Sequence, residues 1–152
     1  MQQMQVQQQV YTARPEDYAF LTEVWEASVR ATHHFLTEED ILFYKPLVRD
    51  EYLQQVELRY VKDENGRIAG FVGTAEGKVE MLFVHPESRG QGIGKKLLQY
   101  AVDALQANAV DVNEQNEQAI GFYEHFGFRT VSRSEVDGMG KPYPILHMQL
   151  PR

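Results

Sequence analysis

The chain has 152 residues, of which 43% are hydrophobic and 11% aromatic, which excludes an intrinsically disordered protein and predicts one domain over residues 1–152. It contains no cysteine, which excludes disulfides, cysteine zinc sites and cysteine nucleophiles. The net charge of −7 predicts that the protein does not bind nucleic acid. The N-terminus has no secretory pattern, and the apolar runs are far shorter than the roughly 18 residues of a membrane span. We therefore expect a cytoplasmic protein that does not bind membranes.

The first half of the chain predicts a strand, two helices and a strand meander. Alternation favours a half-exposed strand over 4–14, and helical spacing favours a helix from Pro15 to about Arg30. A second helix is expected after Thr37, whose spacing to Asp40 is that of a capping box, with an interruption at Pro46. Further strands are expected over 58–62, 68–75 and 78–84, joined by turns at 63–66 and 76–77.

The second half alternates between helices and strands. Apolar residues at helical spacing predict a helix over 92–107 with one buried stripe. A helix over 116–125 is expected to end at Gly127. Strands are expected over 109–113, 128–136 and 145–150. This order predicts an α/β fold with a mixed, mostly antiparallel sheet and helices on both of its faces.

The run Arg89-Gly90-Gln91-Gly92-Ile93-Gly94 lies between a predicted strand and a predicted helix. Glycines there let backbone N–H groups turn inward, and a helix N-terminus favours an anion, so the run predicts a diphosphate site. It is not the dinucleotide fingerprint, because Lys95 stands where the third glycine is needed. It is not a Walker A loop either, because glycine at 89 and serine or threonine at 96 are missing.

Two blocks resemble the GNAT N-acetyltransferases. The run from Met81 to Leu98 looks like their acetyl-CoA motif, R/Q-x-x-G-x-G/A after the fourth strand. The run from Asn113 to Phe128 is similar to their block N-x-x-A-x-x-F-Y-x-x-x-G-F. The segments Thr32 to Leu36 and Gly140 to Pro144 resemble the T-H-x-F-L and G-K-P-Y-P runs of a bacterial subgroup. The resemblance covers the chain from about Val6 to Leu150 and implies the GNAT acyltransferase fold.

The resemblance implies an enzyme that moves an acetyl group from acetyl-CoA to a primary amine by direct attack. The pantetheine arm would pair with the backbone of Leu82, Phe83 and Val84 where the sheet splays open. Arg89, with a weaker contribution from Lys95 or Lys96, would hold the phosphates. Asn116 would bind the pantetheine or cap its helix, and Tyr123 would donate a proton to the leaving thiolate or serve only as core.

The acceptor side is less determined by the sequence. The resemblance implies that His33, His34 and Tyr143 lie in the acceptor wall. The general base is open between Glu80, His33, His34 and a water chain. Two histidines without nearby carboxylate or cysteine spacing predict no metal site. We expect the acceptor to be a small-molecule or peptide amine and the protein to be a monomer or homodimer. The alternative is an inactive CoA-binding sensor or regulatory module.

Overall fold

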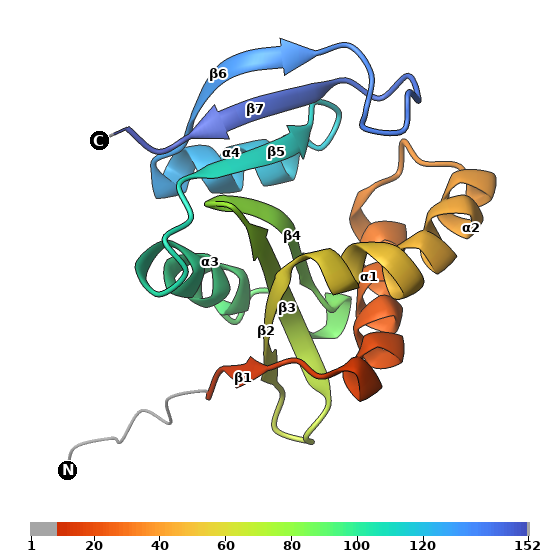
Figure 1. Cartoon of the computed structure of the whole chain (residues 1–152), viewed down its shortest axis with the longest axis vertical. Coiled ribbons are helices and arrows are strands. Elements are labelled where there is room, and N and C mark those ends of the chain that lie inside the picture. Colours follow the sequence, from red (N-terminus) through yellow and green to blue (C-terminus); the bar gives the residue numbers. More distant parts are fainter. Residues whose placement is uncertain (1–8, 152) are drawn as a thin grey trace.

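The computed structural model describes residues 9–151, which contain a seven-stranded sheet in the order β1-β2-β3-β4-β5-β7-β6 (Figure 1). Only β4 and β5 pair in parallel, and every other neighbouring pair is antiparallel. The strands are β1 (Tyr11–Thr12), β2 (Glu57–Lys62), β3 (Ile68–Ala75), β4 (Lys78–Val84), β5 (Ala109–Asn113), β6 (Arg129–Ser134) and β7 (Ile145–Gln149). The α-helices are α1 (Tyr18–Thr32), α2 (Glu38–Leu47), α3 (Ile93–Asp103) and α4 (Glu117–Phe126).

The sheet has a hydrophobic core on each face because its central strands alternate buried side chains. Val61 and Val72 pack with Leu97 and Leu98 of α3 in one core. Leu58, Tyr60 and Phe71 pack with Leu21 and Trp25 of α1 in the other. The predicted fold class is therefore confirmed, with helices on both faces of a mixed sheet. No helix within residues 9–151 is long and apolar enough to cross a membrane.

The sheet opens between β4 and β5, as the resemblance to the GNAT N-acetyltransferases implies. The two strands pair only through Lys78 with Ala109 and Val79 with Val110. β4 stays paired with β3 up to Val84, so its other edge is left without a strand partner beyond residue 79 within the described chain. That edge can accept an extended ligand as an added strand.

The capping box that begins α2 is confirmed, but the interruption at Pro46 is wrong. Thr37 Oγ1 accepts a hydrogen bond from the Asp40 N–H at 3.1 Å, and the Asp40 carboxylate accepts one from the Thr37 N–H at 3.5 Å. The helix runs through Pro46 to Leu47 and then widens into a π-helical turn. Proline removes the hydrogen bond to the carbonyl four residues earlier, on Leu42, which lies on an exposed face that water can reach.

Two other boundaries differ from expectation. α3 ends at Asp103 and not at 107, because Gln106 turns back in the left-handed region with φ +60° and the Ala107 N–H bonds the carbonyl of Ala101. Within the described chain the first strand is limited to Tyr11–Thr12, and its predicted start at residues 4–8 lies outside the described residues. Phe20 of α1 is 61% exposed, so helical spacing alone does not place it in the core.

Candidate functional site

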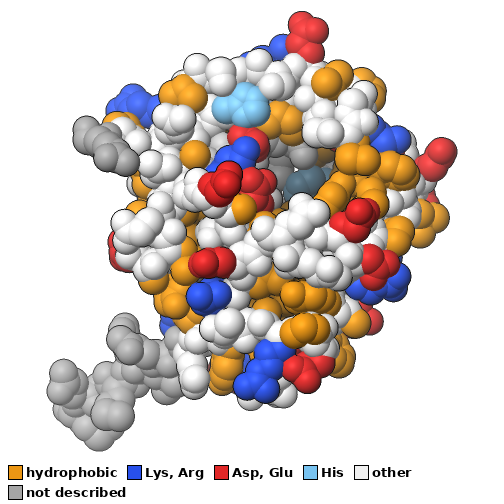
Figure 2. All heavy atoms as spheres, viewed as in Figure 1, with side chains coloured by type: hydrophobic (Ala, Val, Ile, Leu, Met, Phe, Trp, Pro, Cys, Tyr) orange, Lys and Arg blue, Asp and Glu red, His pale blue; other side chains and the backbone are white. Residues whose placement is uncertain are grey.

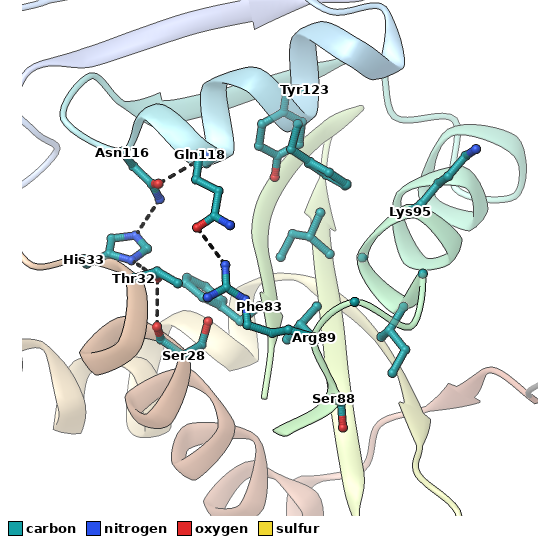
Figure 3. Close-up of a pocket in the computed structure, with 18 residues that line it drawn as sticks. Ser28, Thr32, His33, Phe83, Ser88, Arg89, Lys95, Asn116, Gln118 and Tyr123 are labelled. Carbon is teal, nitrogen blue, oxygen red and sulfur yellow. Dashed lines mark hydrogen bonds between the residues drawn. The ribbon is translucent and has the colours of Figure 1, made fainter. Parts of the chain in front are cut away.

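A cavity of about 360 Å³ lies between β4, the start of α3, and α4, with the end of α1 on its far side (Figure 3). Gln91 is not among the residues that line this cavity. Its lining does contain the other cofactor residues predicted from the sequence, which are Leu82, Phe83, Val84, Arg89, Gly90, Gly92, Ile93, Gly94, Lys95, Asn116 and Tyr123. The edge of β4 and the glycine loop therefore open into one space.

The glycine loop has the backbone geometry of an anion site. Gly90 and Gly92 have φ of +79° and +76°, a region that other L residues rarely adopt. A Cβ on either would meet nothing within 4 Å, so the space beside the loop is open. Ile93 begins α3, whose first N–H groups lack intrahelical partners and carry the positive end of the helix dipole. This donor set fits the diphosphate of a CoA ester.

Arg89 reaches across the cavity. Its Nη2 donates a hydrogen bond of 2.7 Å to Oε1 of Gln118 on α4, so these two side chains bridge the opening (Figure 3). Lys95 lines the cavity, but its ammonium points away from the other labelled side chains (Figure 3). Lys96 does not line the cavity. Sequence reasoning missed Gln118, whose only signal is its place two residues after the helix cap.

Tyr123 presents its hydroxyl to the cavity from α4 (Figure 3). Its ring packs edge-on against Phe122 at 5.1 Å and Phe128 at 5.6 Å. The hydroxyl has no hydrogen-bond partner among residues 9–151. Burial raises the pKa of Tyr123 well above its usual value, which keeps the phenol protonated near neutral pH. The side chain is thus a core aromatic whose protonated hydroxyl faces the cavity.

A hydrogen-bonded chain joins the end of α1 to the start of α4 (Figure 3). Thr32 Oγ1 donates to the Ser28 carbonyl at 2.8 Å and lies 2.8 Å from Nδ1 of His33. Nε2 of His33 lies 3.4 Å from Nδ2 of Asn116. Asn116 Oδ1 accepts the Ala119 N–H at 3.2 Å, which confirms its capping of α4. Burial, followed by the nearby charge of His34, lowers the pKa of His33 to about 4.

A second cavity, of about 570 Å³, lies on the other side of His33 and Phe83, which line both cavities. Its walls include the aromatic rings of Trp25, Tyr44, Tyr52 and Tyr143 and the carboxylates of Glu80 and Asp137. Figure 2 shows the molecule hollowed on this face, beside α2 and the β6–β7 loop. The predicted acceptor residue Tyr143 lies in this wall, whereas His34 is exposed and lines neither cavity.

The β6–β7 loop is held against α2 by three polar contacts. The Tyr143 hydroxyl donates to the Asp40 carboxylate, and Lys141 Nζ lies 3.5 Å from the same carboxyl group. The Tyr44 hydroxyl donates to Asp137 Oδ2 at 2.6 Å. The hydrogen bond from Tyr143 holds the pKa of Asp40 below its usual value and raises that of Tyr143 to about 12. These contacts fix one wall of the second cavity.

Residues 31–149 match the family described as Acetyltransferase (GNAT) domain. Peptidyl-lysine N-acetyltransferase YjaB of Salmonella typhimurium is 39% identical over 139 residues, which cover 91% of this chain and 95% of that protein. Peptidyl-lysine N-acetyltransferase YiaC of Escherichia coli is 33% identical over 135 residues, covering 88% of this chain and 92% of that protein.

Solved structures share the fold. The solution structure of apo-form YjaB from Escherichia coli has a TM-score of 0.85 and 37% identity, and covers 95% of this chain and 97% of that one. PaiA N-acetyltransferase from Thermoplasma acidophilum, solved in complex with coenzyme A, has a TM-score of 0.72 and 21% identity, and covers 95% of this chain and 99% of that one.

Proposed function

The chain belongs to the GNAT acetyltransferase family, and on this premise we propose that it acetylates the side-chain amine of lysine in a protein or peptide. The transfer of an acetyl group from acetyl-CoA to an amine is established by the family and by relatives that are N-acetyltransferases. The proposal concerns the acceptor and the residues that handle it.

The observation that carries the proposal is the meeting of the two cavities at His33 and Phe83. An extended ligand on the free edge of β4 leads from the glycine loop toward Phe83. A side chain that enters the second cavity reaches the same residue from the opposite side. A thioester and an amine placed in this way would lie close enough to react.

The walls of the second cavity suit a lysine side chain. Aromatic rings of Trp25, Tyr52 and Tyr143 offer contact to four methylene groups, while the carboxylates of Glu80 and Asp137 attract an ammonium group. A peptidyl-lysine acceptor is also what the names of the two related enzymes state for those proteins.

Exposed apolar side chains near the second cavity support a polypeptide acceptor. Leu42 and Phe43 on α2 are 57% and 42% exposed, and Val136 and Met139 on the β6–β7 loop are 47% and 48% exposed. The hydrogen bonds between α2 and this loop place the four on neighbouring segments. Apolar side chains gather beside the hollow in Figure 2, and such patches are typical of surfaces that bind other chains.

We assign the chain's own residues the following roles. The glycine loop and Arg89 bind the diphosphate, and the β4 backbone aligns the pantetheine arm. Acetyl-CoA supplies an activated acyl group when bound. Tyr123 donates its proton to the departing thiolate, because its hydroxyl faces the cavity and stays protonated until then. Membership of the family implies that the amine attacks the thioester directly, and the chain has no cysteine that could carry the acetyl group.

The test uses an Nα-acetylated peptide with one lysine, the same peptide with arginine in its place, and free small amines. Thiol release from acetyl-CoA gives the rate, and tandem mass spectrometry locates the acetyl group. We expect acetylation at lysine Nε, with kcat/KM at least about tenfold above any free amine, which corresponds to about 1.4 kcal/mol. Turnover confined to small amines would overturn the acceptor, and CoA binding without turnover of any amine would favour the sensor alternative.

A further inference from the structure

The hydrogen bonds around His33 decide which ring nitrogen carries its proton. The Thr32 hydroxyl has one hydrogen, which it donates to the carbonyl of Ser28 at 2.8 Å. Its contact of 2.8 Å with Nδ1 of His33 therefore requires the ring to be the donor. A neutral ring with its proton on Nδ1 leaves Nε2 as an acceptor with a lone pair.

Asn116 gives the same assignment from the other side of the ring. Its Oδ1 accepts the Ala119 N–H, so its amide NH₂ faces Nε2 of His33 as a donor. The distance of 3.4 Å is at the long end for a hydrogen bond. The lone pair on Nε2 is thus only weakly engaged by Asn116 and is open to a stronger donor.

The position of His33 separates it from the other bases that the sequence left open. His33 lines both cavities, at the place where an amine from one would meet a thioester in the other. Glu80 lines only the second cavity, and its carboxylate lies 3.8 Å from the ammonium of Lys78. His34 lines neither.

The ring is uncharged near neutral pH. Its lowered pKa of about 4 results from burial and then from His34. The other titratable groups that line the two cavities around it are Arg89, Lys95, Tyr123, Tyr44, Tyr52, Glu80, Asp137 and Tyr143. The low pKa makes the imidazole a weak base. The nitrogen of an attacking amine gains positive charge as its bond to the thioester carbon forms, however, so its N–H proton is then far more acidic than in the free amine.

We propose that Nε2 of His33 accepts the proton of the attacking amine. The acceptor ammonium first loses a proton to water. The neutral amine nitrogen then forms a bond to the thioester carbonyl carbon, the carbon–sulfur bond breaks, and one N–H proton passes to Nε2. The departing sulfur takes the proton of Tyr123. The imidazolium then releases one proton to water and the phenolate gains one, so the products are an amide and a thiol. This assignment rests on the proposed function for an amine acceptor but not on which amine it is.

The first test needs no substrate. Nitrogen-15 correlation spectra of the free protein report which nitrogen of each histidine bears hydrogen. We expect His33 near neutral pH to show a protonated Nδ1 and a bare Nε2. A protonated Nε2 would leave no lone pair facing Asn116 and would overturn the proposal.

The second test removes the base and supplies another. With the best acceptor from the amine panel, His33→Ala should lose about 10²-fold in kcat, the lower end for general base catalysis, with acetyl-CoA affinity unchanged by calorimetry. Imidazole and methylimidazoles should restore turnover, faster as the pKa of the added base rises. If the added base only filled the space left by the imidazole, turnover would be restored to an extent independent of the pKa of that base. This result would contradict the proposal, and so would a parental kcat in His33→Ala with the chemical step rate-limiting.

Three further variants make the comparison specific. His33→Gln keeps a hydrogen-bonding side chain without a base, and should be as slow as His33→Ala while melting near the parent. His125→Gln changes an exposed histidine of α4 that lines neither cavity, and should keep the parental rate. Glu80→Gln should raise KM for the acceptor and leave kcat unchanged. If kcat fell in Glu80→Gln and not in His33→Ala, the base would be Glu80. Because the acceptor is chosen from the panel, rejection of lysine peptides refutes the proposed acceptor without deciding the role of His33.

Discussion

Replacing Tyr123 by phenylalanine removes one hydroxyl and keeps the ring. Because the ring still packs against Phe122 and Phe128, and because the hydroxyl has no protein partner within residues 9–151, the free energy of unfolding should change by less than about 1 kcal/mol. Loss of proton donation to the thiolate should lower kcat by about 10² to 10⁴-fold. Acetyl-CoA affinity should change by less than about 1.4 kcal/mol, a factor of ten.

The assay measures single-turnover thiol release, acetyl-CoA affinity by calorimetry and the melting temperature by scanning calorimetry. Tyr100→Phe, on α3 and outside both cavities, is the matched control and should keep the parental rate. Because burial raises the pKa of Tyr123, the parental rate should show no loss from its ionisation up to at least about pH 10. A Tyr123→Phe variant with the parental rate of the chemical step would refute the reasoning, since Tyr123 would then be a packing residue only.

The remaining predictions concern the glycine loop and the β6–β7 loop. CoA at 100 times its Kd should add about 2.7 kcal/mol to the free energy of unfolding, and NADH and ATP should add far less. Gly92→Asp should abolish the stabilisation by CoA, because it places a carboxylate in the diphosphate site. Unchanged CoA affinity in this variant would show that the ligand binds elsewhere. Tyr143→Phe should cost about 1.5 to 3 kcal/mol near neutral pH, the worth of a hydrogen bond to a charged group. That hydrogen bond lowers the pKa of Asp40 in the folded protein, so its contribution to stability is present above the ordinary pKa near about 4 and is lost as the pH falls below that value. The difference in melting temperature between Tyr143→Phe and the parent should therefore narrow in acid. A difference that does not change with pH would contradict this.

The parts of the site that follow from local sequence were predictable. The left-handed glycines at 90 and 92, the cap at Asn116 and the end of α4 at Gly127 each depend on neighbours within a few residues. The strand bounds 68–75, 78–84 and 109–113 agree with the structure for the same reason, because each is a short β-rich run between turns.

The parts of the site that depend on contacts between distant residues could not be predicted from the sequence. Arg89 meets Gln118, and Tyr44 meets Asp137, across 29 and 93 positions of the chain, and no spacing pattern reports such pairs. The choice among bases also required tertiary structure, because His33 lies between two cavities and contacts Asn116, which is 83 positions away in the chain. The predicted interruption at Pro46 is wrong because the local rule against proline in helices takes no account of the solvent that reaches the freed carbonyl.

The central claim is that the two cavities form one site for a thioester and a lysine. A conjugate in which lysine Nε of a peptide is joined through an acetyl spacer to the sulfur of CoA would occupy both. Calorimetry should show the conjugate binding at least about 10²-fold more tightly than CoA, as expected when one molecule occupies two linked sites, and competing with both CoA and the free peptide. The account would be contradicted if the conjugate bound no more tightly than CoA and the free peptide did not compete with it.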